Sequence, residues 1–150
     1  MLTNTYDMRM LQPAFPAQYL VLPEIAVRLA PSTVYPMGCL LGEITATPGV
    51  YGLYVAANTD GTQNAKLLMH RACSTDVSSN VSFAPVAVGG EWGQVAQTAP
   101  AYFDGVFRTL DLLQTGPGAL DVIAVTKTDV RHIGMLTQGT LANGLIKIGN

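Results

Sequence analysis

The chain has 150 residues, of which 49% are hydrophobic and only 12% are charged, and its formal net charge is −2. This length suits a single domain with its own core, and Lys and Arg do not cluster, which argues against a nucleic-acid-binding surface. Soluble domains have roughly 25% charged residues, so we expect other protein to cover part of this surface, as in an oligomer. A monomer solvated by Ser, Thr, Asn and Gln is the alternative.

The first 36 residues differ in composition from the rest of the chain. Five prolines interrupt them and the residues between are largely apolar. Prolines at this spacing prevent a regular helix or a central strand, yet the segment is too apolar for a solvated tail. We therefore predict an extended arm over residues 1–36 that lies on another protein. The alternative is an edge strand on its own domain.

The arm carries the residues that we expect to contact a partner. Gln18–Leu22 has the composition of a strand that adds to the edge of a neighbour's sheet. The expected contact residues are the bulky apolar ones between the prolines: Phe15, Tyr19, Leu20, Val21, Leu22 and Ile25.

Neither a secretory signal nor a membrane span is expected near the N-terminus. Residues 1–7 lack a basic region followed by an apolar one. The apolar stretch from Tyr19 to Ala30 is interrupted by Pro23, Glu24 and Arg28, and it is too short to cross a bilayer.

Residues 37–150 indicate a mainly β domain with one or two short helices. Alternating apolar residues and Gly, Pro and Asn turn signals divide it into short strands. Thr109 is the expected N-cap of a short helix through Leu113, which the glycines at Gly116 and Gly118 would end. The expected strands cover residues 40–47, 50–56, 66–73, 81–88, 91–96, 120–125, 132–136 and 145–148.

Between Val77 and Phe103 the chain contains one charged residue, Glu91, so we expect this region to be deeply packed. Trp92 lies within it. Core packing is the default role for that indole, and an anchor at a contact between subunits is the sharper hypothesis.

No residue pattern indicates catalysis, a metal or a cofactor. His70 and His132 are the only imidazoles, and Cys39 and Cys73 are not in a Cys-x-x-Cys pair. His70 and Cys73 would point to opposite faces of one strand, so they do not suggest a nucleophile and its base. The two cysteines are expected to be reduced core residues, and a disulfide between them is the alternative.

One block of sequence resembles a known family. Gly38–Thr45 reads G-x-x-L-G-x-I-T, and it is followed by a D-G-T-Q turn at Asp60–Gln63 and a strand up to Met69. This pattern is similar to that of the small decoration proteins that cement the outside of tailed-phage heads. The resemblance covers roughly residues 38–148 and is strongest over residues 38–69.

The resemblance implies a compact, mainly β domain of the β-clip type. It also implies a homotrimer on the outer surface of the capsid, made in the host cytoplasm, whose partner is the major capsid protein. In that family the N-terminal segment orders on contact with the capsid protein. The implied function is to stabilise the shell as a structural virion protein, with no enzymatic activity, cofactor, nucleic acid or membrane.

Three alternatives belong to other classes. The β-clip class includes trimeric nucleotide hydrolases similar to dUTPases, but neither their Gly-x-x-Asp-x-x-Tyr stretch nor their Asp-rich metal motif occurs here. Another virion component, such as a tail or fibre-attachment module, would share the low charge but would not explain Asp60–Gln63. A small-ligand barrel would need a convergent polar set, which the sequence does not offer.

Overall fold

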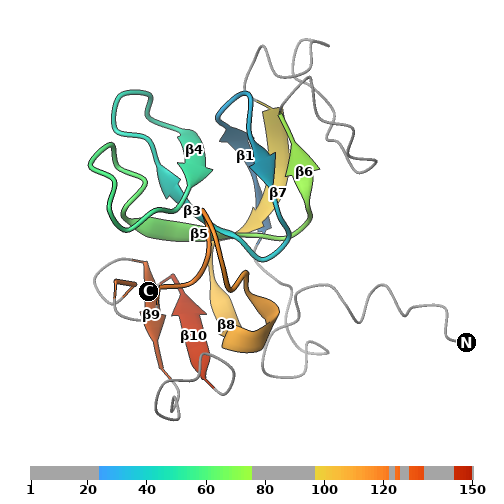
Figure 1. Ribbon diagram of the computed structural model, residues 1–150. Coiled ribbons are helices and arrows are strands. Elements are labelled where there is room, and N and C mark those ends of the chain that lie inside the picture. Colours follow the sequence, from blue (N-terminus) through green and yellow to red (C-terminus); the bar gives the residue numbers. More distant parts are fainter. Residues whose placement is uncertain (1–23, 76–96, 122–123, 126–128, 134–143, 150) are drawn as a thin grey trace, which may run out of the picture.

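The computed structural model describes residues 24–75, 97–121, 124–125, 129–133 and 144–149. These residues form short strands and one turn of 3-10 helix at Thr109–Asp111, so the predicted mainly β fold is confirmed (Figure 1). The strands are β1 Glu24–Leu29, β2 Val34–Tyr35, β3 Leu40–Glu43, β4 Val50–Leu53, β5 Ala65–Met69, β6 Cys73–Ser74, β7 Gln97–Tyr102, β8 Gly105–Arg108, β9 Val130–His132 and β10 Leu145–Ile148.

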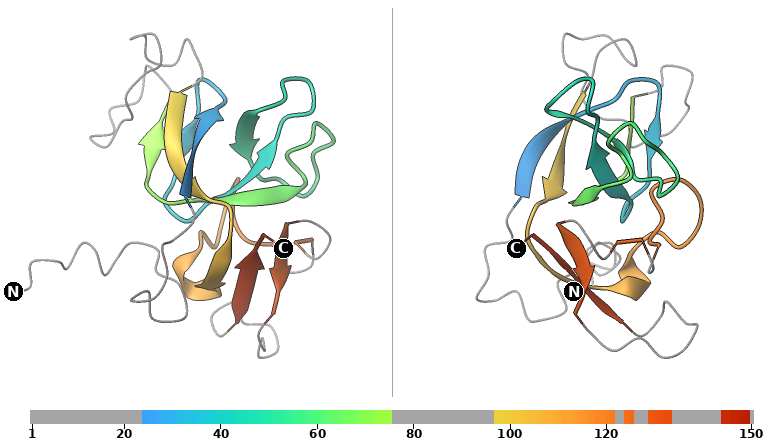
Figure 2. Two further views of the ribbon diagram at one scale, coloured as in Figure 1. Left: turned by 180° about the vertical axis from the view of Figure 1, so that it is seen from behind. Right: turned by 90° about the vertical axis from the view of Figure 1, so that its left-hand side faces the viewer.

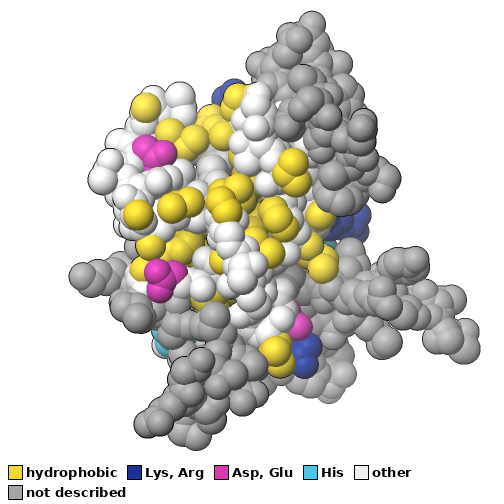
Figure 3. Space-filling model, in the orientation of Figure 1, with side chains coloured by type: hydrophobic (Ala, Val, Ile, Leu, Met, Phe, Trp, Pro, Cys, Tyr) yellow, Lys and Arg dark blue, Asp and Glu magenta, His cyan; other side chains and the backbone are white. Residues whose placement is uncertain are grey.

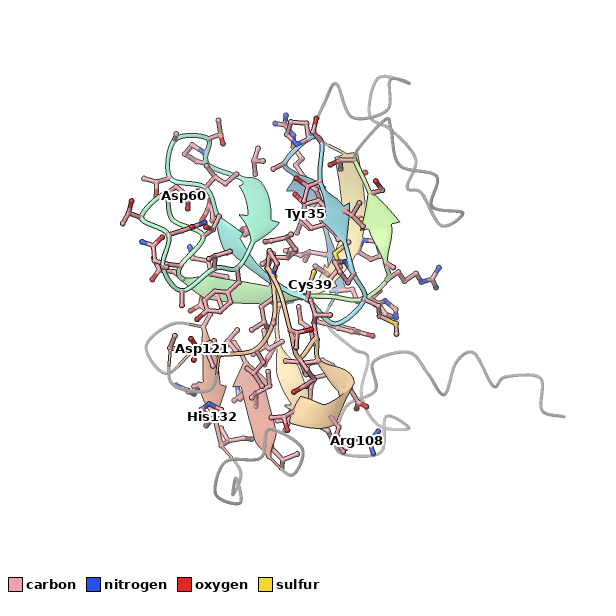
Figure 4. The ribbon with its side chains drawn as sticks, in the orientation of Figure 1. Tyr35, Cys39, Asp60, Arg108, Asp121 and His132 are labelled. Carbon is pink, nitrogen blue, oxygen red and sulfur yellow. The ribbon has the colours of Figure 1, made fainter. Side chains whose placement is uncertain are left out.

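Five strands close into a barrel in the order β1-β4-β3-β5-β7. Side chains alternate between the two faces of each strand, and in β1 this places Val27 and Leu29 in the interior. Tyr35 and Cys39, labelled in Figure 4, are fully buried and belong to the same apolar cluster as Val27 and Leu29. The interior core is therefore built by apolar residues from every barrel strand and by the β2–β6 ribbon that covers one side.

A second sheet, in the order β8-β10-β9, packs below the barrel. The chain passes almost directly from β7 to β8, so the path of β7 continues from the barrel into the lower sheet (Figure 2). A second core joins the two parts: Leu40 and Leu68 from the barrel lie in one apolar cluster with Phe107 and Ile146 of the lower sheet.

The expected boundary of the arm at residue 36 is wrong for residues 24–36. Glu24–Leu29 pairs with β7 at six successive positions, and Val34–Tyr35 pairs with β6. The cause is the alternation of Val27 and Leu29, which lets this stretch bury one face within its own barrel. Ile25 therefore lies in a strand of the body. Residues 1–23, with Phe15, Tyr19, Leu20, Val21 and Leu22, lie outside the described residues.

Several predicted elements have other bounds. β3 ends at Glu43, where the chain begins to turn back toward β4. The Ile44 N–H donates to the Val50 carbonyl at 2.9 Å and closes this turn. The expected strand over residues 120–125 is not a strand where it is described: Asp121 Oδ1 accepts from the Ala124 N–H at 3.2 Å and starts a turn. The expected strand at residues 145–148 is confirmed as β10.

The short helix near residue 109 is confirmed as a single 3-10 turn, but its expected N-cap is wrong. The cap position is Arg108, and the buried Thr109 hydroxyl instead donates to the Gly144 carbonyl at 3.3 Å. The expected strands at residues 81–88 and 91–96, with Trp92, lie outside the described residues. In the part of the chain that is described, no helix is long and apolar enough to cross a membrane.

Candidate interaction surface

The D-G-T-Q turn holds itself together with its own polar groups. Asp60 Oδ1 accepts from the Thr62 N–H at 3.0 Å and from the Thr62 hydroxyl at 2.5 Å, and the Gly61 N–H donates to Gln63 Oε1 at 2.8 Å. The Thr45 N–H donates to the Asp60 carbonyl at 2.8 Å and so ties this turn to the end of β3. The hydrogen bonds from Thr62 also hold the pKa of Asp60 below its usual value.

Two glycines let the D-G-T-Q turn lie directly against β3. A Cβ on Gly61 would lie 2.2 Å from the Glu43 carbonyl oxygen, and a Cβ on Gly42 would lie 2.6 Å from the Thr62 backbone. Gly61 also has a φ of +107°, which favours glycine. The motif residues thus form a locked corner of the barrel, and their polar groups bond one another instead of converging on a cavity.

The buried thiols and the phenol in the barrel are poor nucleophiles. Cys39 and Cys73 are free and buried, as expected for reduced core residues. Burial raises the pKa of Cys73 to about 12, and burial with the neighbouring Cys73 raises that of Cys39 further. Burial likewise raises the pKa of Tyr35, whose hydroxyl donates to the Ala30 carbonyl at 3.0 Å. Since the thiolate is the reactive form, these residues serve packing.

A titratable cluster lies where β1 begins. His70 Nδ1 contacts Glu24 Oε1, and the His70 ring packs against the Tyr102 ring with centroids 4.7 Å apart and the planes tilted by 35°. Burial lowers the pKa of His70, although Glu24 opposes the shift in part. Burial also raises the pKa of Tyr102 to about 12. The cluster fixes the start of β1 against β5 and β7, at the point where residues 1–23 join the body.

A groove of about 510 Å³ lies beside that point. Its apolar wall comes from Ile25, Tyr51, Leu67 and Phe103, and its polar rim from Lys66, Asp104, Asp129 and Gly149. Ile25 and Phe103 are each 41% exposed, which is high for residues of this size and polarity. Two rim charges already have partners: Lys66 lies 2.9 Å from Glu43, and Asp104 lies 3.3 Å from Lys147.

Ile25 follows the same alternation as Val27 and Leu29, so its side chain continues the interior stripe of β1. It is exposed because β4 pairs with β1 only farther along, at Arg28 and Leu29. The groove is therefore an open end of the barrel interior, and its apolar wall suits a side chain supplied from outside.

Of the predicted contact residues, the structure places only Ile25, and it places it in this groove. Sequence reasoning missed Tyr51, Leu67 and Phe103 as members of the same site. Phe103 gave a weak signal, because it directly precedes the Asp104-Gly105 turn, and turns lie at the surface. Tyr51 and Leu67 gave none, since they are ordinary strand residues until the barrel closes.

No group of three or more potential metal ligands occurs among the described residues. Comparison with known families, with characterised proteins and with solved structures gives no match.

Proposed function

We propose that this chain is a decoration protein of a tailed-phage head. It binds the outer surface of the capsid as a homotrimer, contacts the major capsid protein, and stabilises the shell without catalysing a reaction. The observation that carries this proposal is the block Gly38–Thr45 with Asp60–Gln63, which resembles that family. Its glycines and hydrogen bonds serve a rigid corner of the barrel, a use that suits a scaffold better than a reactive site.

The surface composition supports a binding role. With 12% charged residues, the chain has little charge to keep its surface solvated. Hydrophobic side chains gather over the middle of the barrel in the view of Figure 3, with few charged groups among them. Large apolar side chains are exposed in the described part at Ile25, Val34, Phe103, Leu110 and Ile133. Such a surface is expected when other protein covers it.

The stabilising mechanism is mass action. A protein that binds only the assembled, expanded shell stabilises that state by its binding free energy. A trimer offers three arms to the shell, so contacts that are weak one by one gain from a high effective concentration.

Co-sedimentation with expanded heads of the phage that carries the gene, prepared without this protein, tests the proposal. We expect the full chain to pellet with the heads and to saturate, and the heads to withstand heating or chelation better. A chain that begins at Glu24 keeps β1 and should bind much more weakly. Absence of any binding by the folded full chain would refute the proposal.

Two inexpensive measurements separate the alternatives. Light scattering after size exclusion distinguishes a trimer from the larger ring expected of a tail component. A pyrophosphatase assay on nucleoside triphosphates with magnesium tests for a hydrolase, and we expect no turnover above a blank.

A further inference from the structure

One edge of β1 pairs with a neighbouring strand over only part of its length. β1 pairs with β7 at all six of its residues, but with β4 only at Arg28 and Leu29. In the described part of the chain, no strand therefore pairs with the β4-facing edge of Glu24–Val27. An unpaired strand edge is a template for another extended segment.

The register shows which backbone groups face this edge. Ala26 lies opposite Pro100, which has no N–H, and the Pro100 carbonyl accepts from the His70 N–H on the β5 side at 3.3 Å. The Ala26 N–H and C=O therefore point away from β7. Four residues farther along, the Ala30 N–H donates to the Tyr51 carbonyl of β4 at 2.9 Å. Alternate residues of a strand direct their N–H and C=O to the same edge, so the Ala26 groups face the β4 side as well.

The open edge borders the groove, because Ile25 belongs to both. An extended segment laid along Glu24–Val27 could place alternate side chains against Ile25, Tyr51 and Phe103. The edge supplies backbone hydrogen bonds, and the groove supplies an apolar site for side chains of the added strand.

We propose that Gln18–Leu22 of a second copy of this chain occupies this edge, with an apolar side chain in the groove. The segment is uncharged, contains no proline, and has four apolar residues in five. Two of the three charged rim residues, Lys66 and Asp104, already have charged partners, and the third is Asp129, so an uncharged strand fits the site better than an acidic one. The inference rests on the part of the proposed function that gives the arm a protein partner, and it needs no capsid.

A tight hairpin within the same copy fits this edge poorly. To lie beside its own Glu24–Val27, Gln18–Val21 would have to reverse through a two-residue turn at Leu22–Pro23. The two-residue turns that suit hairpins need positive φ at both positions, or glycine at the first. Pro23 is fixed near a φ of about −65° and Leu22 is not glycine. A second copy meets no such restriction.

The arm is short, and this sets the arrangement of the copies. Gln18 lies six residues before Glu24, so it reaches at most about 20 Å from its own β1. The accepting copy must then be a direct neighbour. In a ring of three, each copy donates its arm to the next and accepts one from the previous copy.

Self-association in solution, without capsids, is the first test. We expect Ile25→Asp and Phe103→Asp to weaken association by about tenfold or more, because each places a charge on the apolar wall. Leu110→Asp and Ile133→Asp are the matched controls: both residues are large, apolar and exposed, and neither lines the groove. Equal loss in the controls, or a full chain that is monomeric at high concentration, would overturn the proposal.

The edge itself is tested at Ala26. Ala26→Pro removes an N–H that faces away from β7, so the β1–β7 hydrogen bonds remain, while Ala26→Thr keeps that N–H. We expect only the proline variant to lose association, with both variants keeping the circular dichroism of the parent. Full association of a folded Ala26→Pro variant would contradict strand addition.

Disulfide trapping identifies the occupant. Chains with Ala26→Cys are mixed with chains that carry one introduced cysteine at position 18, 19, 20, 21 or 22, and are oxidised with copper phenanthroline; the native Cys39 and Cys73 are buried in both. Paired strands bring opposite Cβ atoms within disulfide range, so alternate positions should give a linked pair of different chains. A chain that carries both Ala26→Cys and one of the arm cysteines is oxidised as a comparison. If a disulfide forms within that chain but none forms between different chains, each copy binds its own arm.

Capsid binding by the same variants separates this inference from the proposed function. Loss of self-association with weakened but still measurable capsid binding supports the inference and leaves the capsid as the partner in the proposed function. If no variant changes self-association but a chain starting at Glu24 loses the capsid, the inference fails and the proposed function does not.

Discussion

Gly61 shows how a single residue fixes the corner of the barrel. We predict that Gly61→Ala destabilises the fold by about 2–4 kcal/mol, because it combines a positive φ with a backbone clash. Gly49→Ala is the matched control: Gly49 has a φ of +84°, but an added Cβ there would meet no atom within 4 Å, so it should cost only about 1 kcal/mol. Urea denaturation followed by circular dichroism measures both; equal losses would contradict the role of the close contact.

The pH dependence of stability should depend on His70. Its pKa is lowered by burial from an ordinary value of 6.5, so the unfolded chain binds the proton more readily than the folded one. The neutral His70 ring therefore contributes fully to the stability of the fold above pH 6.5. This stability is lost as the pH falls below 6.5 toward the lower pKa that His70 has in the folded chain. In the parent chain, the urea concentration at the midpoint of unfolding should fall as the pH is lowered from about 7 to about 5.

The groups around His70 define the control for that experiment. Glu24 of β1 contacts the ring, the Tyr102 ring of β7 packs against it, and Arg71 follows it in the chain. The pKa values of Glu43 and Asp60 are lowered, so these carboxylates stay charged across this range. His70→Gln should flatten the decline, and an unchanged slope in that variant would show that another group is responsible.

At the scale of elements, β1 decides where the arm begins. We predict that deleting residues 1–23 leaves a folded domain, whereas deleting residues 1–30 abolishes the fold. The second deletion removes six positions of pairing with β7 and the buried side chains of Val27 and Leu29. Near-ultraviolet circular dichroism and amide dispersion by NMR distinguish the two products. A native-like spectrum from the shorter chain would mean that β1 is dispensable.

The sequence predicted some of the strands, but it missed β1, β2, β7 and β8 and the closure of the strands into a barrel. Strand alternation and turn residues located β3, β4, β5 and β10, because those signals are local. Pro23 and Pro31 favoured the prediction of an extended arm, so the strand β1 between them was not predicted. Its partner β7 lies about 70 residues away in the chain, and such pairing leaves no local trace. The groove depends on the same closure, so Ile25 was predicted for its apolarity alone.

The turn at Asp121 shows where an apolar pattern misleads. Residues 120–125 are apolar enough for a strand, and Leu120 and Val125 are indeed buried. The Asp121 side chain bonds the backbone three residues later, and such local bonds compete with strand pairing. The apolar pattern therefore predicts a strand here, whereas the presence of Asp121 indicates a turn.

At the scale of the whole molecule, the barrel and the lower sheet share one apolar cluster. Leu40, Leu68 and Tyr102 come from the barrel side, while Phe107 and Ile146 come from the lower sheet. The rings of Tyr102 and Phe107 have centroids 5.0 Å apart across the junction. Because neither part can bury these faces alone, the two should unfold together.

We predict that Ile146→Ala lowers the free energy of unfolding by about 2–5 kcal/mol, since the side chain is fully buried in the shared cluster. Leu145→Ala, on the other face of β10 and half-buried, is the control and should cost clearly less. In both variants far- and near-ultraviolet circular dichroism should give coincident urea transitions. If the lower sheet were an independent unit, Ile146→Ala would instead separate the curve into two steps, with the barrel transition unmoved.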